Sequence, residues 1–365
     1  MNKIKYLMIA LMAVILSVNL TACSDDDDNT KSNVERYQSE VEAAVKAQKK
    51  NNKAILLVAF GSTWQQAFDA FDQTVAAYKS AFPGYDVYLS FSSAICINRA
   101  AAGENAADGA EIRNYYAPNY WLEAFGRAGY EDITVQSLQV IPGEEYGRVV
   151  NFLKDFGNNV NNTLSNEYLK NVKLHLGTPL MATTDDVDAL ADALHANFSK
   201  YSSNGIVAFM GHGNPNEYDT YSANIRYTQL EEALQAKYGK NYYVGTVDME
   251  DNFKTQVFAR MQANGVQGNV YCAPLMSVAG DHAHNDMAGD DDEFNLNEEN
   301  GEMEDTSWKV YFNAQDGFTC NDELEKDVVR GLLEYSNVRQ LWINHTKTAV
   351  ASEPLEYFHS NDGTE

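Results

Sequence analysis

An unbroken apolar run, Ala54-Ile-Leu-Leu-Val-Ala-Phe60, stands near the start of the chain's globular part and is followed by Gly61-Ser62-Thr63. Such runs are typical of a strand that is covered on both faces, as in a parallel sheet. After the glycine, large apolar residues recur at intervals of three and four up to Pro83-Gly84, which predicts a helix with one buried face. These residues are Trp64, Phe68, Phe71, Val75, Tyr78 and Phe82. The region therefore predicts a strand, a turn and a helix in that order.

The same alternation of strands and helices continues along the rest of the chain. Strands are expected at 85–91, 133–138, 172–176, 206–210, 242–247 and 269–273, and helices at 34–50, 119–127, 144–156, 184–201, 228–238, 251–263 and 322–341. This order predicts a doubly wound α/β fold with parallel sheets. The strands fall into two groups on either side of about residue 165, so we expect two similar α/β domains that face a central cleft.

We expect six parts along the chain. They are a lipoprotein signal peptide at 1–22, an acidic linker and leading helix at 23–50, an N-terminal α/β domain at 51–165, a C-terminal α/β domain at 166–321 with an acidic insertion at 292–306, a helix at 322–347 that packs back on the N-terminal domain, and a tail at 348–365.

The N-terminus has the pattern of an export signal. Lys3 and Lys5 precede the apolar run Leu7 to Leu16, which is too short for a comfortable membrane span. The run leads to Leu20-Thr21-Ala22-Cys23, which resembles a bacterial lipobox, and an acidic tract follows. We therefore expect a lipid on Cys23 and a place in the bacterial cell envelope, either periplasmic or surface-exposed. An ordinary secretory signal is the alternative.

Composition narrows the set of partners. The chain has 52 acidic and 27 basic residues and a formal net charge of −25. Nucleic acids and anionic membrane surfaces both need clustered basic side chains, so neither is an expected partner, and membrane contact is expected through the N-terminal lipid only. Three cysteines remain beyond the signal, Cys96, Cys272 and Cys320, and their odd number and wide spacing do not predict a disulfide framework.

Three histidines follow predicted strands, at the edge where open α/β sheets bind ligands. His212 stands between Gly211 and Gly213, which let the backbone turn and leave the imidazole uncovered. Imidazole binds first-row metals and is a base near neutral pH. A histidine that merely caps a tight turn is the alternative. His282 and His284 follow the strand at 269–273, and these three histidines together predict a site for a divalent metal ion.

The loop that carries His282 also holds Asp281 and Asp286, and either carboxylate is a candidate to orient an imidazole. Gly61-Ser62-Thr63 opens a helix, so its backbone N–H groups are suited to an anion such as a carboxylate, and a plain strand-to-helix turn is the alternative. Arg99 is a candidate for a second carboxylate contact.

Four segments in order resemble a known family: Ile55-Leu-Leu-Val-Ala-Phe-Gly-Ser-Thr63, Val135-Gln-Ser-Leu-Gln-Val-Ile-Pro-Gly-Glu-Glu-Tyr146, Phe209-Met-Gly-His-Gly213 and Pro274-Leu-Met-Ser-Val-Ala-Gly-Asp-His-Ala-His-Asn-Asp-Met-Ala288. They are similar to the anaerobic sirohydrochlorin cobaltochelatases, which are class II tetrapyrrole chelatases related to ferrochelatase. The resemblance runs from about residue 52 to 340.

The resemblance implies that a divalent metal, Co2+ in the first place, is inserted into a metal-free tetrapyrrole without ATP. His212 matches a histidine that binds metal and helps to remove pyrrole protons, and His282 matches one that lines the same site. Gly61, Ser62 and Thr63, together with Arg99, Gly211 and Gly213, are then expected to contact the tetrapyrrole. Gln139 stands where the family usually has a second metal-binding histidine, and its carboxamide oxygen is a candidate metal ligand. Glu144 or Glu145 nearby is an alternative donor.

Two further hypotheses remain open from the sequence. The first is a non-catalytic lipoprotein that binds a tetrapyrrole such as haem, or a metal, on the chelatase fold. The second is a metal scavenger that uses the acidic insertion. Fe2+ and Ni2+ remain alternatives to Co2+, and the sequence leaves the oligomeric state open.

Overall fold

The computed structural model describes residues 32–219, 221–289, 306–320 and 329–357. The chain divides into two compact units, Met1–Arg36 and Tyr37–Glu365, and the second contains all strands described below. The expected signal peptide, Cys23 and almost all of the acidic insertion lie outside the described residues. No helix within the described ranges combines the length and the apolarity that a membrane span requires.

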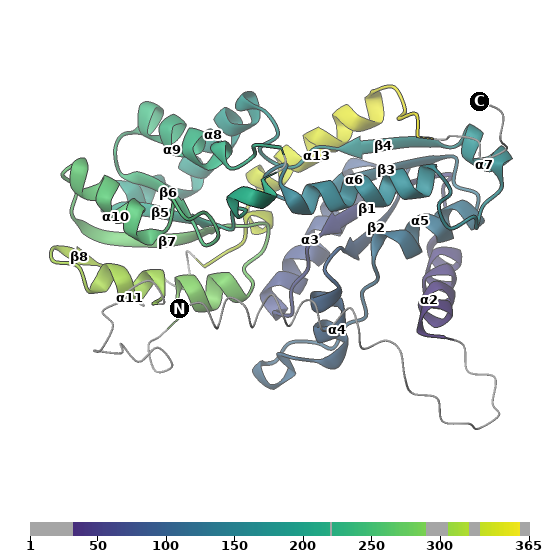
Figure 1. The fold of residues 1–365 in the computed structure, drawn as a ribbon, viewed down its shortest axis with the longest axis horizontal. Coiled ribbons are helices and arrows are strands. Elements are labelled where there is room, and N and C mark those ends of the chain that lie inside the picture. Colours follow the sequence, from purple (N-terminus) through teal and green to yellow (C-terminus); the bar gives the residue numbers. More distant parts are fainter. Residues whose placement is uncertain (1–31, 220, 290–305, 321–328, 358–365) are drawn as a thin grey trace. The chain divides into compact units, whose positions relative to one another are not determined.

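The first sheet is parallel throughout and has the strand order β2-β1-β3-β4 (Figure 1). Its strands are β1 (Lys53–Ala59), β2 (Asp86–Phe91), β3 (Asp132–Ser137) and β4 (Lys173–Gly177). The helices of this half are α2 (Asn33–Gln48), α3 (Gln65–Ala81), α4 (Ala94–Ala102), α5 (Pro118–Arg127), α6 (Glu144–Gly157) and α7 (Asn166–Asn171), with a short 3-10 turn η1 (Ala106–Asp108).

The second sheet has the order β6-β5-β7-β8, and its strand pairs are also parallel. Its strands are β5 (Ile206–Gly211), β6 (Tyr242–Thr246), β7 (Gly268–Leu275) and β8 (Phe318–Thr319). Its helices are α8 (Thr184–Ser202), α9 (Ile225–Tyr238), α10 (Lys254–Ala263) and α11 (Trp308–Asn313), with a 3-10 turn η2 (Asn216–Tyr218) and a π-helical turn η3 (His282–Met287). Counted from its own first strand, each sheet has the order 2-1-3-4, which confirms the predicted pair of similar α/β halves.

The central strand of each sheet is covered on both faces, as the apolar run at 54–60 predicted. In β1, Ile55 and Leu57 belong to one buried cluster, whereas Leu56 and Val58 belong to another. Strand β5 divides in the same way: Val207 and Phe209 join the cluster of Ile55, and the even-numbered residues of the strand join a third. One cluster is thus shared by the two sheets and joins the halves through a continuous core.

The last helix, α13 (Ser336–Ala351), links the halves (Figure 1). It contacts β3 and β4 of the first sheet and α8 of the second half. Trp342 is fully buried at its centre and donates from its indole to the carbonyl oxygen of Gln139 at 3.3 Å. The short 3-10 turn η6 (Leu332–Glu334) precedes this helix.

Two predicted boundaries differ from the structure. Strand β4 pairs with β3, so the first sheet extends to Gly177 and a division at residue 165 would cut it apart. The last helix was expected to begin at about residue 322, but it begins at Ser336, and residues 321–328 lie outside the described part of the chain. Both errors concern pairing and packing between distant segments, which local periodicity does not report.

Candidate functional site

His212 follows β5 directly, in a turn that its two neighbouring glycines make possible. A Cβ on Gly211 would lie 2.3 Å from the ring of Tyr227, and Gly213 has a left-handed φ of 82°. The hydroxyl of Tyr227 accepts a hydrogen bond from the backbone N–H of Gly213 at 3.2 Å. The close approach of Tyr227 and the left-handed turn together bring the His212 side chain to the surface, where it is 50% exposed.

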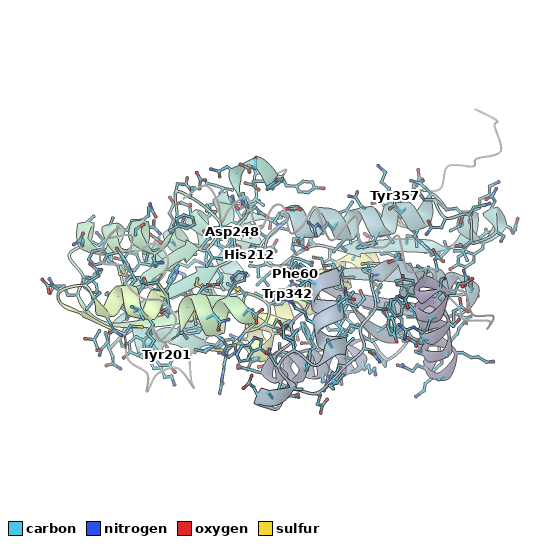
Figure 2. The ribbon with its side chains drawn as sticks, turned by 60° about the horizontal axis from the view of Figure 1, so that its bottom comes forward. Phe60, Tyr201, His212, Asp248, Trp342 and Tyr357 are labelled. Carbon is cyan, nitrogen blue, oxygen red and sulfur yellow. The ribbon has the colours of Figure 1, made fainter. Side chains whose placement is uncertain are left out.

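Asp248, which follows β6, fixes the His212 ring. His212 Nδ1 lies 3.2 Å from the Asp248 carboxylate and 2.8 Å from the carbonyl oxygen of Gly213. Both neighbours are hydrogen-bond acceptors, so Nδ1 carries the proton and Nε2 is the nitrogen left for a metal ion. Figure 2 shows His212 and Asp248 together at this edge of the second sheet.

His282 is the first residue of η3 and has its own carboxylate partner. Its Nδ1 lies 2.5 Å from Asp286, one helical turn further on. This hydrogen bond raises the pKa of His282 above its ordinary value against the effect of burial, and the charges of Asp286, Asp248 and Asp281 act in the same direction. Of the two carboxylates that the sequence offered, Asp286 therefore orients the ring.

The two imidazoles lie together at the carboxyl ends of neighbouring strands. Their ring centroids are 4.9 Å apart and their planes are nearly perpendicular, at 83°. With each Nδ1 held by a carboxylate, the two Nε2 atoms are the donors available to one divalent ion or to one ion and one proton. Within the described ranges no group of three or more His, Cys, Asp or Glu is gathered around a metal position. Two imidazoles alone would fill two of the four or more positions around a divalent ion.

Gln139 lies two residues beyond β3 and its side chain is engaged elsewhere. Its Oε1 accepts a hydrogen bond from the Ser137 hydroxyl, and the residue as a whole is 9% exposed. Its Nε2 is buried and makes no hydrogen bond to any described residue. The carbonyl oxygen of Gln139 accepts from Leu180 and from Trp342. The structure therefore ties Gln139 to the first half, with its side chain bonded to Ser137 and not to His212 or His282.

The four segments that carry the family resemblance meet in space. A Cβ on Gly280 would lie 3.4 Å from the hydroxyl of Ser62, so the first segment lies against the last. The backbone N–H of Glu144 donates to the side chain of Asn214 at 3.3 Å, which joins the second segment to the residue after Gly213. Loops that are far apart in sequence thus converge around the two histidines.

The two hydroxyls of the Gly61-Ser62-Thr63 turn are hydrogen-bonded within the protein. Gly61 has a φ of 124°, and a Cβ there would lie 2.8 Å from the ring of Phe91. Ser62 accepts a hydrogen bond from the backbone of Trp64, and Thr63 accepts one from Asn105. Both hydroxyls are buried and already bonded. Contact between this turn and a tetrapyrrole remains a prediction.

Comparison with known proteins identifies the family. Residues 53–351 match the cobalt chelatase (CbiK) family along their whole length. The chain belongs to this family. It is 31% identical over 304 residues to the sirohydrochlorin cobaltochelatase CbiKC of Nitratidesulfovibrio vulgaris, a match that covers 82% of this chain and 91% of that protein. It is 27% identical over 304 residues to the sirohydrochlorin cobaltochelatase of Salmonella typhimurium, which covers 82% of this chain and 96% of the relative.

The fold has a counterpart among solved structures. The structure of SirB from Bacillus subtilis with Fe3+ matches with a TM-score of 0.50 at 14% identity, and it covers 82% of this chain and 96% of that chain. At this identity the likeness concerns the fold alone. It agrees with the two parallel α/β halves described above and supports the chelatase architecture that the CbiK family match indicates.

The structure gives Arg99 carboxylate partners from the chain itself. This side chain on α4 lies 3.4 Å from Glu104 and 3.9 Å from Asp281 and is 51% exposed. Glu144 and Glu145, the alternative donors near Gln139, lie 2.6 Å and 3.6 Å from Arg148 on their own helix. The role of Arg99 in holding a tetrapyrrole carboxylate therefore remains a prediction.

Sequence reasoning missed the roles of two residues of this CbiK-family site. Asp248 was not predicted as the partner of His212, although a carboxylate beyond the neighbouring strand is suited to that position. Trp64 was assigned to the buried face of α3, but its indole N–H donates to Asp281 at 2.6 Å and its ring stacks on His284. His284 is thus brought to the site's edge by Trp64.

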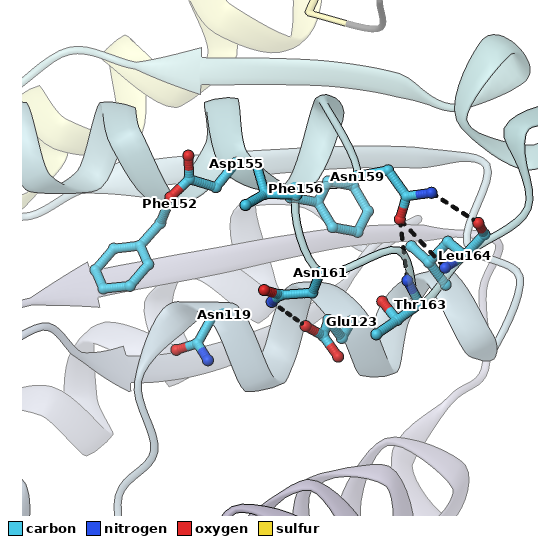
Figure 3. A pocket seen from close by; sticks show the side chains of 10 residues that line it. Asn119, Glu123, Phe152, Asp155, Phe156, Asn159, Asn161, Thr163 and Leu164 are labelled. Atoms are coloured by element: carbon cyan, nitrogen blue, oxygen red, sulfur yellow. Dashed lines mark hydrogen bonds between the residues drawn. The ribbon is translucent and has the colours of Figure 1, made fainter. Parts of the chain in front are cut away.

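A separate hollow of about 310 Å3 lies between α5, α6 and the turn after α6 (Figure 3). Asn161 donates to Glu123 across it at 2.7 Å. Its lining residues are Asn119, Glu123, Phe152, Asp155, Phe156, Asn159, Val160, Asn161, Thr163 and Leu164, and none of them was a predicted site residue. The hollow is distinct from the histidine pair.

Proposed function

We propose that this protein inserts a divalent metal ion, Co2+ in the first place, into a metal-free tetrapyrrole of the sirohydrochlorin class without ATP. The observation that carries the proposal is the pair His212 and His282, with ring centroids 4.9 Å apart and a carboxylate on the Nδ1 of each. Membership of the cobalt chelatase family and two relatives that are named sirohydrochlorin cobaltochelatases support it.

The chemistry needs groups that hold the metal ion and groups that take protons from the macrocycle. Insertion of a divalent ion replaces two pyrrole N–H protons, which must leave as the metal–nitrogen bonds form. In this proposal the Nε2 atoms of His212 and His282 hold the ion first. As the ion passes to the macrocycle nitrogens, each freed Nε2 accepts one of the two pyrrole protons and later releases it to solvent. Asp286 stabilises the imidazolium of His282, since its hydrogen bond already raises the pKa of His282.

An open coordination sphere suits an ion that must be handed on. A site with four protein ligands would hold a metal in place, whereas two imidazoles leave positions for water and then for the macrocycle nitrogens. Imidazole accepts Co2+, Fe2+ and Ni2+ alike, so the choice among them rests on the macrocycle and on metal supply.

The test is metallation by the purified protein. Sirohydrochlorin and Co2+ are mixed under anaerobic conditions, and the absorbance change is compared with the rate without protein. Fe2+ and Ni2+ are assayed in parallel to rank the metals. The proposal expects a protein-dependent rate for Co2+. Tetrapyrrole binding with no acceleration for any of these ions would contradict it and favour the non-catalytic binding protein.

We also propose that the protein is anchored in the bacterial cell envelope through a lipid on Cys23. The sequence pattern Leu20-Thr21-Ala22-Cys23 supports this proposal. Radiolabelled palmitate fed to expressing cells should enter the wild-type protein and not Cys23→Ala. Equal labelling of both proteins would contradict the anchor.

A further inference from the structure

The π-helical turn that carries His282 is held by a residue of the first half. Trp64 Nε1 donates to Asp281 Oδ1 at 2.6 Å, and the Trp64 ring stacks on His284 with centroids 3.8 Å apart and planes 14° from parallel. Asp281 and His284 flank His282 in the sequence. The tryptophan therefore restrains the histidine from both sides.

Trp64 occupies a position in which tryptophan is unusual. Trp64 stands at the N-cap of α3, where serine, threonine, aspartate and asparagine are preferred, and its side chain makes no capping hydrogen bond. Nothing in the local geometry of the helix favours an indole there. The ring packs against the core cluster that the two sheets share, and the contacts to Asp281 and His284 account for the indole N–H and for the exposed side of the ring.

The turn itself needs outside support. η3 is a single π-helical turn of six residues, and such a turn has little stability of its own. Its first residues are bonded to Gly280, whose carbonyl oxygen accepts from the backbone of Ala283 and His284. The orientation of His282 thus depends on how the entry to the turn is held.

Arg99 adds a weaker contact to the same carboxylate. Its guanidinium lies 3.9 Å from Asp281, and the two side chains are 51% and 53% exposed. Solvent screens an ion pair with this exposure, so most of the restraint comes from the indole hydrogen bond.

We propose that Asp281 is a positioning residue that sets the orientation of His282 for metal transfer. Asp281 is held by the hydrogen bond from Trp64 and, more weakly, by the ion pair with Arg99. The inference rests on the proposed function for its catalytic consequence. Trp64 and Arg99 belong to the half with the first sheet, whereas Asp281 and His282 follow β7 of the second. The orientation of His282 in the second half then depends on residues of the first.

The test compares Trp64→Phe with a matched control variant, Tyr238→Phe. Trp64→Phe keeps an aromatic ring for His284 and removes the donor to Asp281. Tyr238→Phe makes the same change elsewhere, because Tyr238 donates to Asp192 at 2.7 Å and stacks on His195 with centroids 3.7 Å apart. Tyr238 precedes β6, at the opposite end of the strand from Asp248, so this variant is the control.

We expect Trp64→Phe to weaken Co2+ binding, measured without tetrapyrrole, by about ten-fold. The same variant should lower kcat by about ten-fold and change the KM for tetrapyrrole by less than about two-fold. Tyr238→Phe should leave all three values unchanged. Asp281→Asn, which keeps an oxygen acceptor for the indole, should retain more activity than Asp281→Ala. The thermal unfolding midpoint of each variant separates these effects from a loss of fold.

Equal Co2+ affinity and equal kcat in Trp64→Phe and Tyr238→Phe would overturn the inference. Failure of the proposed function has a different signature. In that case the wild-type protein metallates no tetrapyrrole, but Co2+ binding still weakens in Trp64→Phe and not in Tyr238→Phe. This result would support Asp281 as a positioning residue and would exclude the chelatase reaction.

Discussion

The two sheets share one strand order, yet the residues beyond their strands differ in kind. Beyond β5 and β7 of the second sheet stand His212 and His282, each with a carboxylate on Nδ1. Beyond β1 and β3 of the first sheet stand the Gly61-Ser62-Thr63 turn and Gln139. The hydroxyls of Ser62 and Thr63 and the Oε1 of Gln139 are bonded within their own half. The same architecture thus carries imidazole chemistry at one edge and closed hydrogen-bonding turns at the other.

This difference indicates that the two halves have different roles in the proposed site. In the proposed site the second half supplies both metal donors. The first half supplies restraints, through Trp64 on Asp281 and through the backbone of Glu144 on Asn214. A metal ion is therefore expected to bind at one edge of the paired sheets and not symmetrically between them.

The largest expected effect is that of removing the metal donor from the second half. His212→Ala should lower the rate of metallation by about 10²- to 10⁴-fold, because a metal ligand is lost together with a base next to the reacting nitrogens. His195→Ala, which removes a histidine stacked on Tyr238 away from the site, is the control. Equal rates for His212→Ala and the wild type would exclude His212 from the reaction.

The second-largest effect is expected from the carboxylates that are bonded to the two histidines. Asp248→Asn and Asp286→Asn should each weaken Co2+ affinity by about 10- to 100-fold, because the amide no longer fixes the ring with Nε2 free. Asp192→Asn, at an exposed pair with Lys237, should leave the affinity unchanged. Isothermal titration with Co2+ measures all three, and a loss shared by Asp192→Asn would show that net charge alone sets the affinity.

The pH dependence tests His282 specifically. Its pKa is raised above the ordinary value, and only the neutral ring binds metal or takes a proton, so activity should rise as the pH rises through that raised pKa. The stabilising contact with Asp286 behaves in the opposite way: it is fully present below the ordinary pKa and is lost as pH rises through the raised one.

Asp286→Asn should therefore move the acidic limb of the rate profile to lower pH, even though its maximum rate is reduced. Rate profiles of the wild type and of Asp286→Asn measure the shift. A limb at the same pH in both proteins would assign it to a group other than His282.

The smallest effect should come from the first half. Gln139→His should change Co2+ affinity by less than about two-fold, because the side chain at this position is buried and bonded to Ser137. Leu138→Met, a volume-conserving change at the buried neighbouring position, is the control for packing. A large gain in Co2+ affinity or metallation in Gln139→His alone would show that the metal site extends across both halves.

Much of the fold could be predicted because its signals are local. The apolar run at 54–60 and the three-four spacing after it correspond to β1 and α3. The membership of β4 could not be predicted in this way, since a short strand at 172–176 fits either group of strands until its pairing is known. The π-helical turn at His282–Met287 also leaves no distinct periodicity in the sequence.

The site could be predicted in part for the same reason. Glycines around His212 and the cluster at Asp281–Asp286 are visible in the sequence, and the spacing of four between His282 and Asp286 suits a helical pair. The pairing of His212 with Asp248 and of Trp64 with Asp281 joins residues far apart in the chain. Such contacts appear only once the sheets are assembled.

The X-ray absorption spectrum of Co2+ bound to the purified protein tests the one-sided metal site most directly. The structure predicts two imidazole nitrogens on the cobalt in the wild type, and one in either His212→Ala or His282→Ala. A coordination sphere of oxygens that is the same in the wild type and in both variants would contradict the histidine site and direct attention to the acidic residues at 292–306.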